Sequence, residues 1–76
     1  MVYFFDDEDE NAIDFTPRER KILKYIIQGF ENHEIAEELH VSIHTVKFYA
    51  SSIIKKLNAK KRTHAAFLAM QMNIFK

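Results

Sequence analysis

The sequence predicts an all-α fold of four helices in one small domain, preceded by an acidic N-terminal tail. The 76 residues contain one glycine and one proline, too few chain-breaking residues for strands joined by tight turns. Apolar residues recur at steps of three and four through most of residues 16–76, which is the spacing of one helix face. The hydrophobic residues, 47% of the chain, provide material for a single core.

Charge is divided unevenly along a chain whose net charge is zero. Residues 1–15 hold six acids and no Lys or Arg, so we expect this segment to be a poorly structured tail. Residues 16–76, the expected helical domain, hold all eleven Lys and Arg against five acids, a net charge of +6. This division is typical of a nucleic-acid-binding domain with an acidic appendage, and two ordinary solvated surfaces would also produce it.

The composition disfavours several classes of protein. Because the chain has no cysteine, it has neither disulfides nor a thiolate metal site. Its apolar stretches are far shorter than the roughly 20 residues that a membrane span needs. The apolar residues 2–5 are followed by acids and have no basic region before them, so we do not expect them to act as a secretory signal. We therefore expect a cytoplasmic protein with no membrane partner.

The first helix is expected over residues 17–28. Thr16 can cap it, Pro17 suits the first helical position, and Glu19 stands where a capping box requires an acid. Its apolar face is Ile22, Leu23, Ile26 and Ile27. Gly29 follows this face and is the natural left-handed stop. Ile13 and Phe15 are placed to join the edge of the core just before the helix.

Two further helices, expected over residues 32–39 and 43–57, form a pair joined by a tight turn. The expected core of this pair is Ile35, Ala36, Leu39, Val41 and Val46. Ser42 can cap the later helix, whose inward face continues through Ala50, Ile53, Ile54 and Leu57. The outward face includes His44, Lys47, Phe48, Ser51, Ser52 and Lys55.

The fourth helix is expected over residues 63–73, with Thr63 as its cap. This segment is apolar on more than one side, so one side is expected to pack inside and another to meet a second chain. The residues expected at that dimer interface are Phe67, Leu68, Met70, Gln71 and Ile74.

Residues spread over positions 15–63 follow the signature of a known family. Its opening segment is matched by residues 15–20, and its central spacings by Gly29, Asn32, Ile35, Ala36, Leu39, Val41, Thr45, Val46 and Lys47. Residues 56–59 and 62–63 match its next segment. The chain thus resembles the LuxR/GerE-type (NarL-like) helix-turn-helix domain, in particular stand-alone members without a receiver or sensor domain. It departs from the pattern at Phe48 and Tyr49, where Asn and His are common.

The resemblance implies DNA binding through the third helix and dimerisation through the fourth. It places Thr45 and Lys47 against phosphates or base edges, and Phe48, Ser51 and Lys55 in the groove or along its walls. His44 lies beside the helix N-terminus, where backbone amides and the helix dipole favour a phosphate. The basic residues Lys60, Lys61 and Arg62 are expected to add affinity for the DNA backbone. The expected partner is double-stranded DNA, bound by a homodimer in the bacterial cytoplasm and its nucleoid.

Other interpretations stay open at this point. The same fold could be a protein-interaction module that binds RNA polymerase or another regulator, with DNA binding masked or lost. Lys47 and Lys55 could form an ordinary solvated face, and Tyr49 could belong to the core or a dimer surface. An enzyme is disfavoured because no convergent acid–base set or phosphate-binding loop is present. The four histidines lack metal-site spacing, so neither a metal nor another cofactor is expected.

Overall fold

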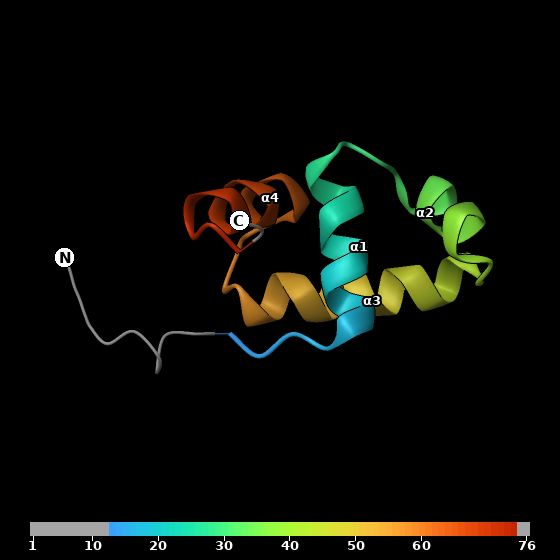
Figure 1. Ribbon diagram of the computed structural model, residues 1–76, viewed down its shortest axis with the longest axis horizontal. Coiled ribbons are helices and arrows are strands. Elements are labelled where there is room, and N and C mark those ends of the chain that lie inside the picture. The colour runs from blue at the N-terminus through green and yellow to red at the C-terminus, as the bar shows by residue number, and fades with distance from the viewer. Residues whose placement is uncertain (1–12, 75–76) are drawn as a thin grey trace, which may run out of the picture.

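The structure, a computed structural model, describes residues 13–74 of the chain. It contains four helices and, within the described residues, no strand: α1 (Pro17–Ile27), α2 (Asn32–Leu39), α3 (Ile43–Lys56) and α4 (Arg62–Gln71) (Figure 1). The predicted all-α, four-helix fold is therefore confirmed; the predicted bounds of α2 match, and those of the other helices differ from these by at most two residues. Residues 1–12 of the expected acidic tail lie outside the described residues.

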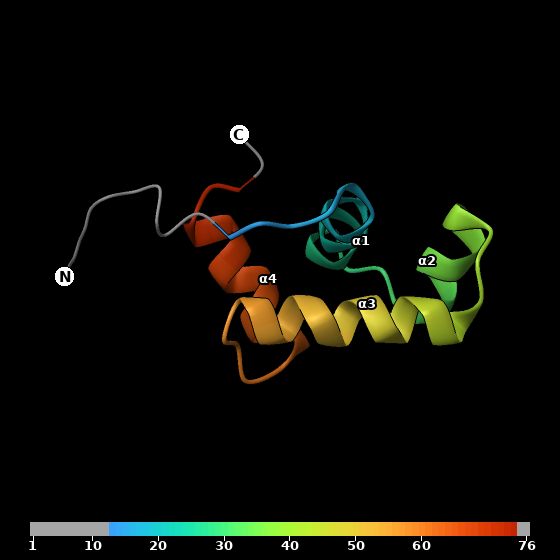
Figure 2. The same cartoon turned by 90° about the horizontal axis from the view of Figure 1, so that it is seen from below.

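Helix α3 is the longest helix and contacts each of the other three (Figure 1). Figure 2 shows α1 and α2 lying on one side of α3, with α4 near its C-terminal end. Helix α1 crosses the middle of α3 and also packs against α4. One side of α3 is thus used for packing, which leaves its other side to face outward.

The core lies where the four helices meet. Its fully buried large side chains are Ile22, Leu23, Ile35, Val46 and Ile53, and α4 adds the buried Ala65 and Ala69. Of the residues expected in the core of the helix pair, Ile35, Ala36 and Val46 are buried, while Leu39 and Val41 are half-buried against the same cluster. Phe15 is also buried and Ile13 packs on the core, as expected. The folded part therefore begins before the tail boundary predicted at residue 15.

The starts of α1 and α3 have the predicted caps. The Thr16 hydroxyl accepts a hydrogen bond from the Glu19 backbone N–H at 3.1 Å, and the Thr16 backbone N–H donates to Glu19 Oε1 at 2.9 Å. Ser42 Oγ accepts from the Thr45 backbone N–H at 3.1 Å. The predicted cap of α4 is wrong, because this helix begins at Arg62 and Thr63 lies inside its first turn. At this start of α4 the Lys60 backbone N–H donates a hydrogen bond to the His64 side chain, at Nδ1, over 3.0 Å.

All four helices are followed by a residue in the left-handed conformation: Gly29 (φ 92°), His40 (φ 57°), Asn58 (φ 56°) and Asn73 (φ 60°). In each case the next residue's N–H donates to a carbonyl in the last turn of the helix. These bonds are Phe30 to Tyr25, Val41 to Ala36, Ala59 to Ile54 and Ile74 to Ala69. They close the helices with the hydrogen-bond pattern of a Schellman motif. Gly29 is the left-handed stop that the sequence predicted.

Replacing His40 by glycine is expected to stabilise the domain by about 0.5–1 kcal/mol. A left-handed backbone costs an ordinary residue roughly 1–2 kcal/mol, and the greater freedom of glycine in the unfolded chain offsets part of that gain. The exposed His40 makes the turn of the helix pair, so its side chain has little packing to lose. Urea denaturation measures the change in unfolding free energy.

The matched control is Gly29→Ala at the end of α1. A Cβ at residue 29 would meet no atom within 4 Å, so backbone strain alone should lower the stability, by about 1 kcal/mol. A loss of stability on His40→Gly would show that the imidazole contributes a contact that outweighs the backbone strain.

Candidate nucleic-acid interface

The outward side of α3 is a continuous exposed face. His44, Lys47, Phe48, Ser51 and Lys55 are all exposed, and they recur at steps of three and four along the helix. The opposite side carries the buried Val46, Ala50 and Ile53. The packing that fixes α3 in the core therefore turns these five sequence-predicted site residues outward together. We call these five residues the α3 face.

Thr45 is half-buried at the start of α3. Its hydroxyl lies 3.0 Å from Ser42 Oγ, and its backbone N–H donates to the same oxygen. The cap thus holds Thr45 next to the first turn, where backbone amides lack intrahelical partners and the helix dipole is positive. This end of α3 is electrostatically suited to a phosphate, and the exposed His44 and Lys47 stand beside it.

The basic residues after α3 separate into two groups. Lys60 and Lys61 are exposed in the connector to α4. Arg62 is half-buried, and its guanidinium donates to Asn32 Oδ1 at 2.6 Å and to the Phe30 carbonyl at 2.7 Å. Sequence reasoning missed this role of Arg62, although Asn32 and Arg62 both belong to the family signature. Arg62 fastens the start of α4 to the start of α2.

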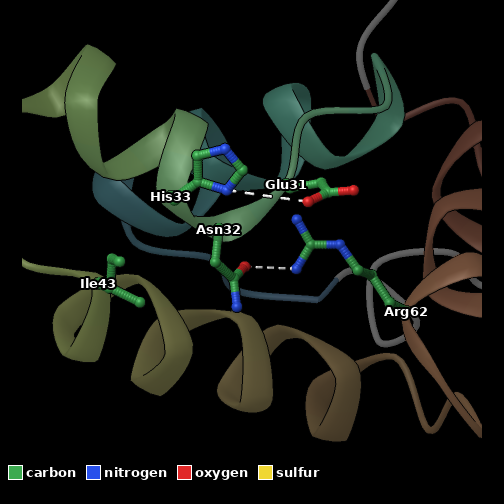
Figure 3. Close-up of a pocket in the computed structure, with 5 residues that line it drawn as sticks. All are labelled: Glu31, Asn32, His33, Ile43 and Arg62. Atoms are coloured by element: carbon green, nitrogen blue, oxygen red, sulfur yellow. Dashed lines mark hydrogen bonds and ion pairs between the residues drawn. The ribbon is translucent and has the colours of Figure 1, made fainter.

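An open hollow of about 480 Å³ surrounds this junction, lined by Glu31, Asn32, His33, Ile43 and Arg62. Figure 3 shows the guanidinium of Arg62 reaching across from α4 toward Glu31 and Asn32. Burial lowers the pKa of Arg62 from its usual value, and the Glu31 carboxylate opposes that effect. The side chain stays cationic at neutral pH because the arginine guanidinium is effectively always protonated in proteins. The hydrogen bonds of Arg62 are therefore charge-assisted.

The side of α3 that faces α1 carries an ion pair absent from the predictions. Glu19 is 4% exposed, and its Oε1 accepts from Lys56 Nζ at 2.7 Å while its Oε2 accepts from Ser52 Oγ at 2.8 Å. Lys56 Nζ also donates to the Asp14 carbonyl at 2.9 Å. The prediction that Ser52 faces outward is wrong, because its hydroxyl is committed to Glu19.

Burial by itself would raise the pKa of Glu19. The hydrogen bonds from Lys56, from the Thr16 backbone and from Ser52, together with the charge of Lys56, lower it from 4.5 to about 2. Glu19 is therefore ionised in the folded protein at neutral pH, and Lys56 is occupied in compensating it. Glu19 thus links the cap of α1 to the C-terminal half of α3.

Helix α4 presents apolar side chains to solvent. Phe67 is 57% and Met70 64% exposed, Gln71 is exposed, and Leu68 and Ile74 are half-buried. The fully buried residues of α4 are the two alanines Ala65 and Ala69. Of the residues predicted for a dimer interface, Phe67 and Met70 thus lie on the exposed apolar side of α4. Leu68 and Ile74 pack partly against the core.

Residues 13–74 contain neither a cluster of metal-ligating side chains nor a helix suited to a membrane. In that part of the chain, no three His, Cys, Asp or Glu side chains gather where they could hold a metal ion. None of the described helices has the length and apolar character to cross a membrane.

The sequence was compared with those of known families and proteins. Residues 14–69 match the family described as "Bacterial regulatory proteins, luxR family". The response regulator protein VraR of Staphylococcus aureus (strain Mu3 / ATCC 700698) is 44% identical over 59 residues, which is 78% of this chain and 28% of VraR. VraR of Staphylococcus saprophyticus gives the same values. This chain therefore spans little more than a quarter of the length of these relatives.

This chain is also similar to chains in solved structures. A chain in the crystal structure of the anti-activator RapF complexed with the response regulator ComA DNA-binding domain has a TM-score of 0.72 and 42% identity, covering 75% of this chain and 98% of that one. The Vibrio cholerae VqmA dimer has a TM-score of 0.79 at 24% identity, over 87% of this chain and 30% of that one, which supports the fold alone. With its family match, its four helices and its outward α3 face, this chain belongs to the LuxR family of bacterial regulatory proteins, as a helix-turn-helix DNA-binding domain.

Proposed function

We propose that this chain regulates transcription by docking α3 in the major groove of duplex DNA. The α3 face carries the proposal: two lysines, a histidine, a serine and a phenylalanine lie exposed on one side of a 14-residue helix. Such a helix is about 21 Å long, and a major groove about 12 Å wide admits it. The N-terminal half of a recognition helix reaches the base edges, which gives His44, Thr45, Lys47 and Phe48 the inner positions.

Most of the affinity is expected to come from phosphates. Lys47 and Lys55 extend from α3, and Lys60 and Lys61 follow it in the connector, so four exposed cations are spread along α3 and the segment after it. Arg62 was assigned to phosphates from the sequence, but its hydrogen bonds to Asn32 and Phe30 favour a structural role. Asn, Gln and Arg, the usual bidentate readers of bases, do not occur among the exposed residues of α3.

A mobility-shift selection from a random-sequence DNA pool, repeated at several salt concentrations, tests the proposed function. A sequence-specific regulator should enrich a consensus and bind it with a steep salt dependence, because each phosphate contact releases counterions. If the chain retains duplex DNA but enriches no sequence, it binds only the DNA backbone. Failure to retain any duplex at low salt would contradict the proposal.

The proposal includes a homodimer formed through α4. One small domain buries too little surface for tight, specific DNA binding, and a two-fold dimer would place two recognition helices about 34 Å apart on a near-palindromic site. The exposed Phe67 and Met70 supply the apolar surface that such a contact requires.

Replacing Met70 by aspartate is expected to make the protein monomeric. The carboxylate would lie at the centre of the apolar contact, where an unpaired charge is costly to bury. Sedimentation velocity over a range of protein concentrations measures the change. The control is His33→Asp, which adds an acid to the exposed first turn of α2, and it should leave the dimer intact. A parent protein that is monomeric at every concentration would contradict the α4 interface.

A second candidate function is binding to another regulator or to RNA polymerase through the same domain. The observation that favours it is the solved complex of the anti-activator RapF with the response regulator ComA DNA-binding domain, to which this fold is similar. A protein that covers the α3 face would compete with DNA for it. The proposed place of action for either function is the bacterial cytoplasm, at the nucleoid when DNA is bound.

A further inference from the structure

Phe48 is the most exposed large hydrophobic side chain in the described part of the chain, at 68%. Its ring meets the ring of Tyr49 edge-on, with centroids 5.5 Å apart and planes at 76°. Tyr49 is half-buried and packs against the core. This contact favours a fixed position for the Phe48 ring on the α3 face, among side chains that are otherwise polar or charged.

Two of the side chains beside Phe48 are short serines, and one of these serines is already hydrogen-bonded within the protein. An open hollow of about 290 Å³ is lined by Phe48, Ser51, Ser52 and Lys55. The Ser52 hydroxyl donates to Glu19, so it does not offer that proton to a ligand. Ser51 is short, and Lys55 can extend outward to a phosphate. The lining of this hollow therefore combines an apolar ring, two serine hydroxyls of which one is bonded to Glu19, and the Lys55 side chain.

The chemistry of the major groove limits what a phenylalanine can recognise there. Base edges in this groove present hydrogen-bond donors and acceptors, and their one apolar group is the C5-methyl of thymine. A phenyl ring satisfies no donor or acceptor, so it loses affinity against any polar edge that it desolvates. Phe48 lies in the second turn of α3, within the N-terminal half that reaches base edges.

We propose that Phe48 is a specificity-determining residue that selects thymine by contact with its C5-methyl group. This inference rests on the proposed docking of α3 in the major groove. Because no exposed residue of α3 is Arg, Asn or Gln, the methyl contact of Phe48 and the ammonium of Lys47 are the direct readers of sequence on this face. The operator should therefore contain at least one required thymine in each half-site.

Substitution of deoxyuridine for thymidine tests the proposal. In the duplex enriched from the random pool, each thymine is replaced singly by uracil, which removes the methyl group and keeps the base pairing. Binding of the full chain is measured for each duplex. The wild type should lose about fivefold in affinity at one position per half-site, the factor expected for one buried methyl group. Phe48→Ala should bind the thymine and uracil duplexes equally.

Two control variants separate methyl recognition from general affinity. Phe48→Leu keeps an apolar contact and should retain most of the thymine preference. Lys55→Ala should lower the affinity for the thymine and uracil duplexes by the same factor, so the ratio of the two affinities should not change. Wild type that binds selectively but ignores every uracil substitution would overturn the role of Phe48, although the proposed function would stand. Unchanged discrimination in Phe48→Ala would overturn it too, because another residue would then contact the methyl group. Absence of any DNA binding would instead remove the proposed function.

Discussion

Replacing Lys56 by methionine is expected to destabilise the domain by about 3 kcal/mol, since removing the ammonium leaves the buried charge of Glu19 uncompensated. Glu19 is almost fully buried, and the Lys56 ammonium lies 2.7 Å from its carboxylate. Methionine keeps an unbranched apolar stem beside Phe15, over whose ring the ammonium lies at 5.6 Å. For a domain of this size, the loss is a large part of the total stability. Urea denaturation followed by circular dichroism measures it.

The double variant Glu19→Gln/Lys56→Met separates the charge from the packing. Glutamine at residue 19 can still accept from the Thr16 backbone N–H, so the cap of α1 is kept while the buried charge is removed. The double variant should therefore be more stable than Lys56→Met alone. If Lys56→Met changes the unfolding free energy by less than about 0.5 kcal/mol, the pair is not coupled as its geometry implies.

The same ion pair predicts the acid sensitivity of the fold. The pKa of Glu19 is lowered from 4.5 to about 2 on folding, so the stabilisation is fully present above pH 4.5 and is lost as pH falls toward 2. At 1.36 kcal/mol for each pH unit, its full size is about 3 kcal/mol. Unfolding titrations between pH 6 and about 2 should show a steeper decline in the wild type than in Glu19→Gln. Parallel declines would assign acid unfolding to other groups.

Removing both lysines of the α3 face, as Lys47→Ala/Lys55→Ala, is expected to weaken DNA binding about a hundredfold at low salt. Each contact between a lysine and a phosphate or base edge contributes about tenfold, and the two residues stand two turns apart on the same exposed side. The slope of the logarithm of affinity against the logarithm of salt concentration should fall by roughly two. Fluorescence anisotropy with labelled duplex measures both quantities.

The matched control removes the same charge from a different helix. Lys21 and Lys24 are exposed on α1, so Lys21→Ala/Lys24→Ala should leave the affinity within a few-fold of the wild type. Both double variants should melt near the wild-type temperature, because exposed substitutions are usually worth no more than about 0.5 kcal/mol. Equal losses of DNA affinity in the two double variants would point to net charge rather than to docking of α3.

The four helices could be predicted because their signals are local. Thr16, Pro17 and Glu19 define the start of α1 within four residues, and Gly29 marks its end through a backbone preference. The predicted start of α4 was wrong because it also rested on a local signal. Thr63 is a good capping residue, but the helix begins one residue before it. Arg62 is its first residue, and the bonds of Arg62 to Asn32 and Phe30 join that end of α4 to α2.

The sequence by itself determined the helical class, the family and the exposed α3 face, because helix periodicity fixes which side chains share a side. Only the tertiary structure decided which polar side chains are partnered. Ser52 and Lys56 share periodicity with surface residues, and Arg62 resembles one more basic residue of the connector. Ser52 and Lys56 bond to Glu19, and Arg62 bonds to Asn32. These partners are separated by 30 to 37 positions in the sequence. Contacts over such separations depend on how the helices cross, and no local pattern of residues encodes that crossing.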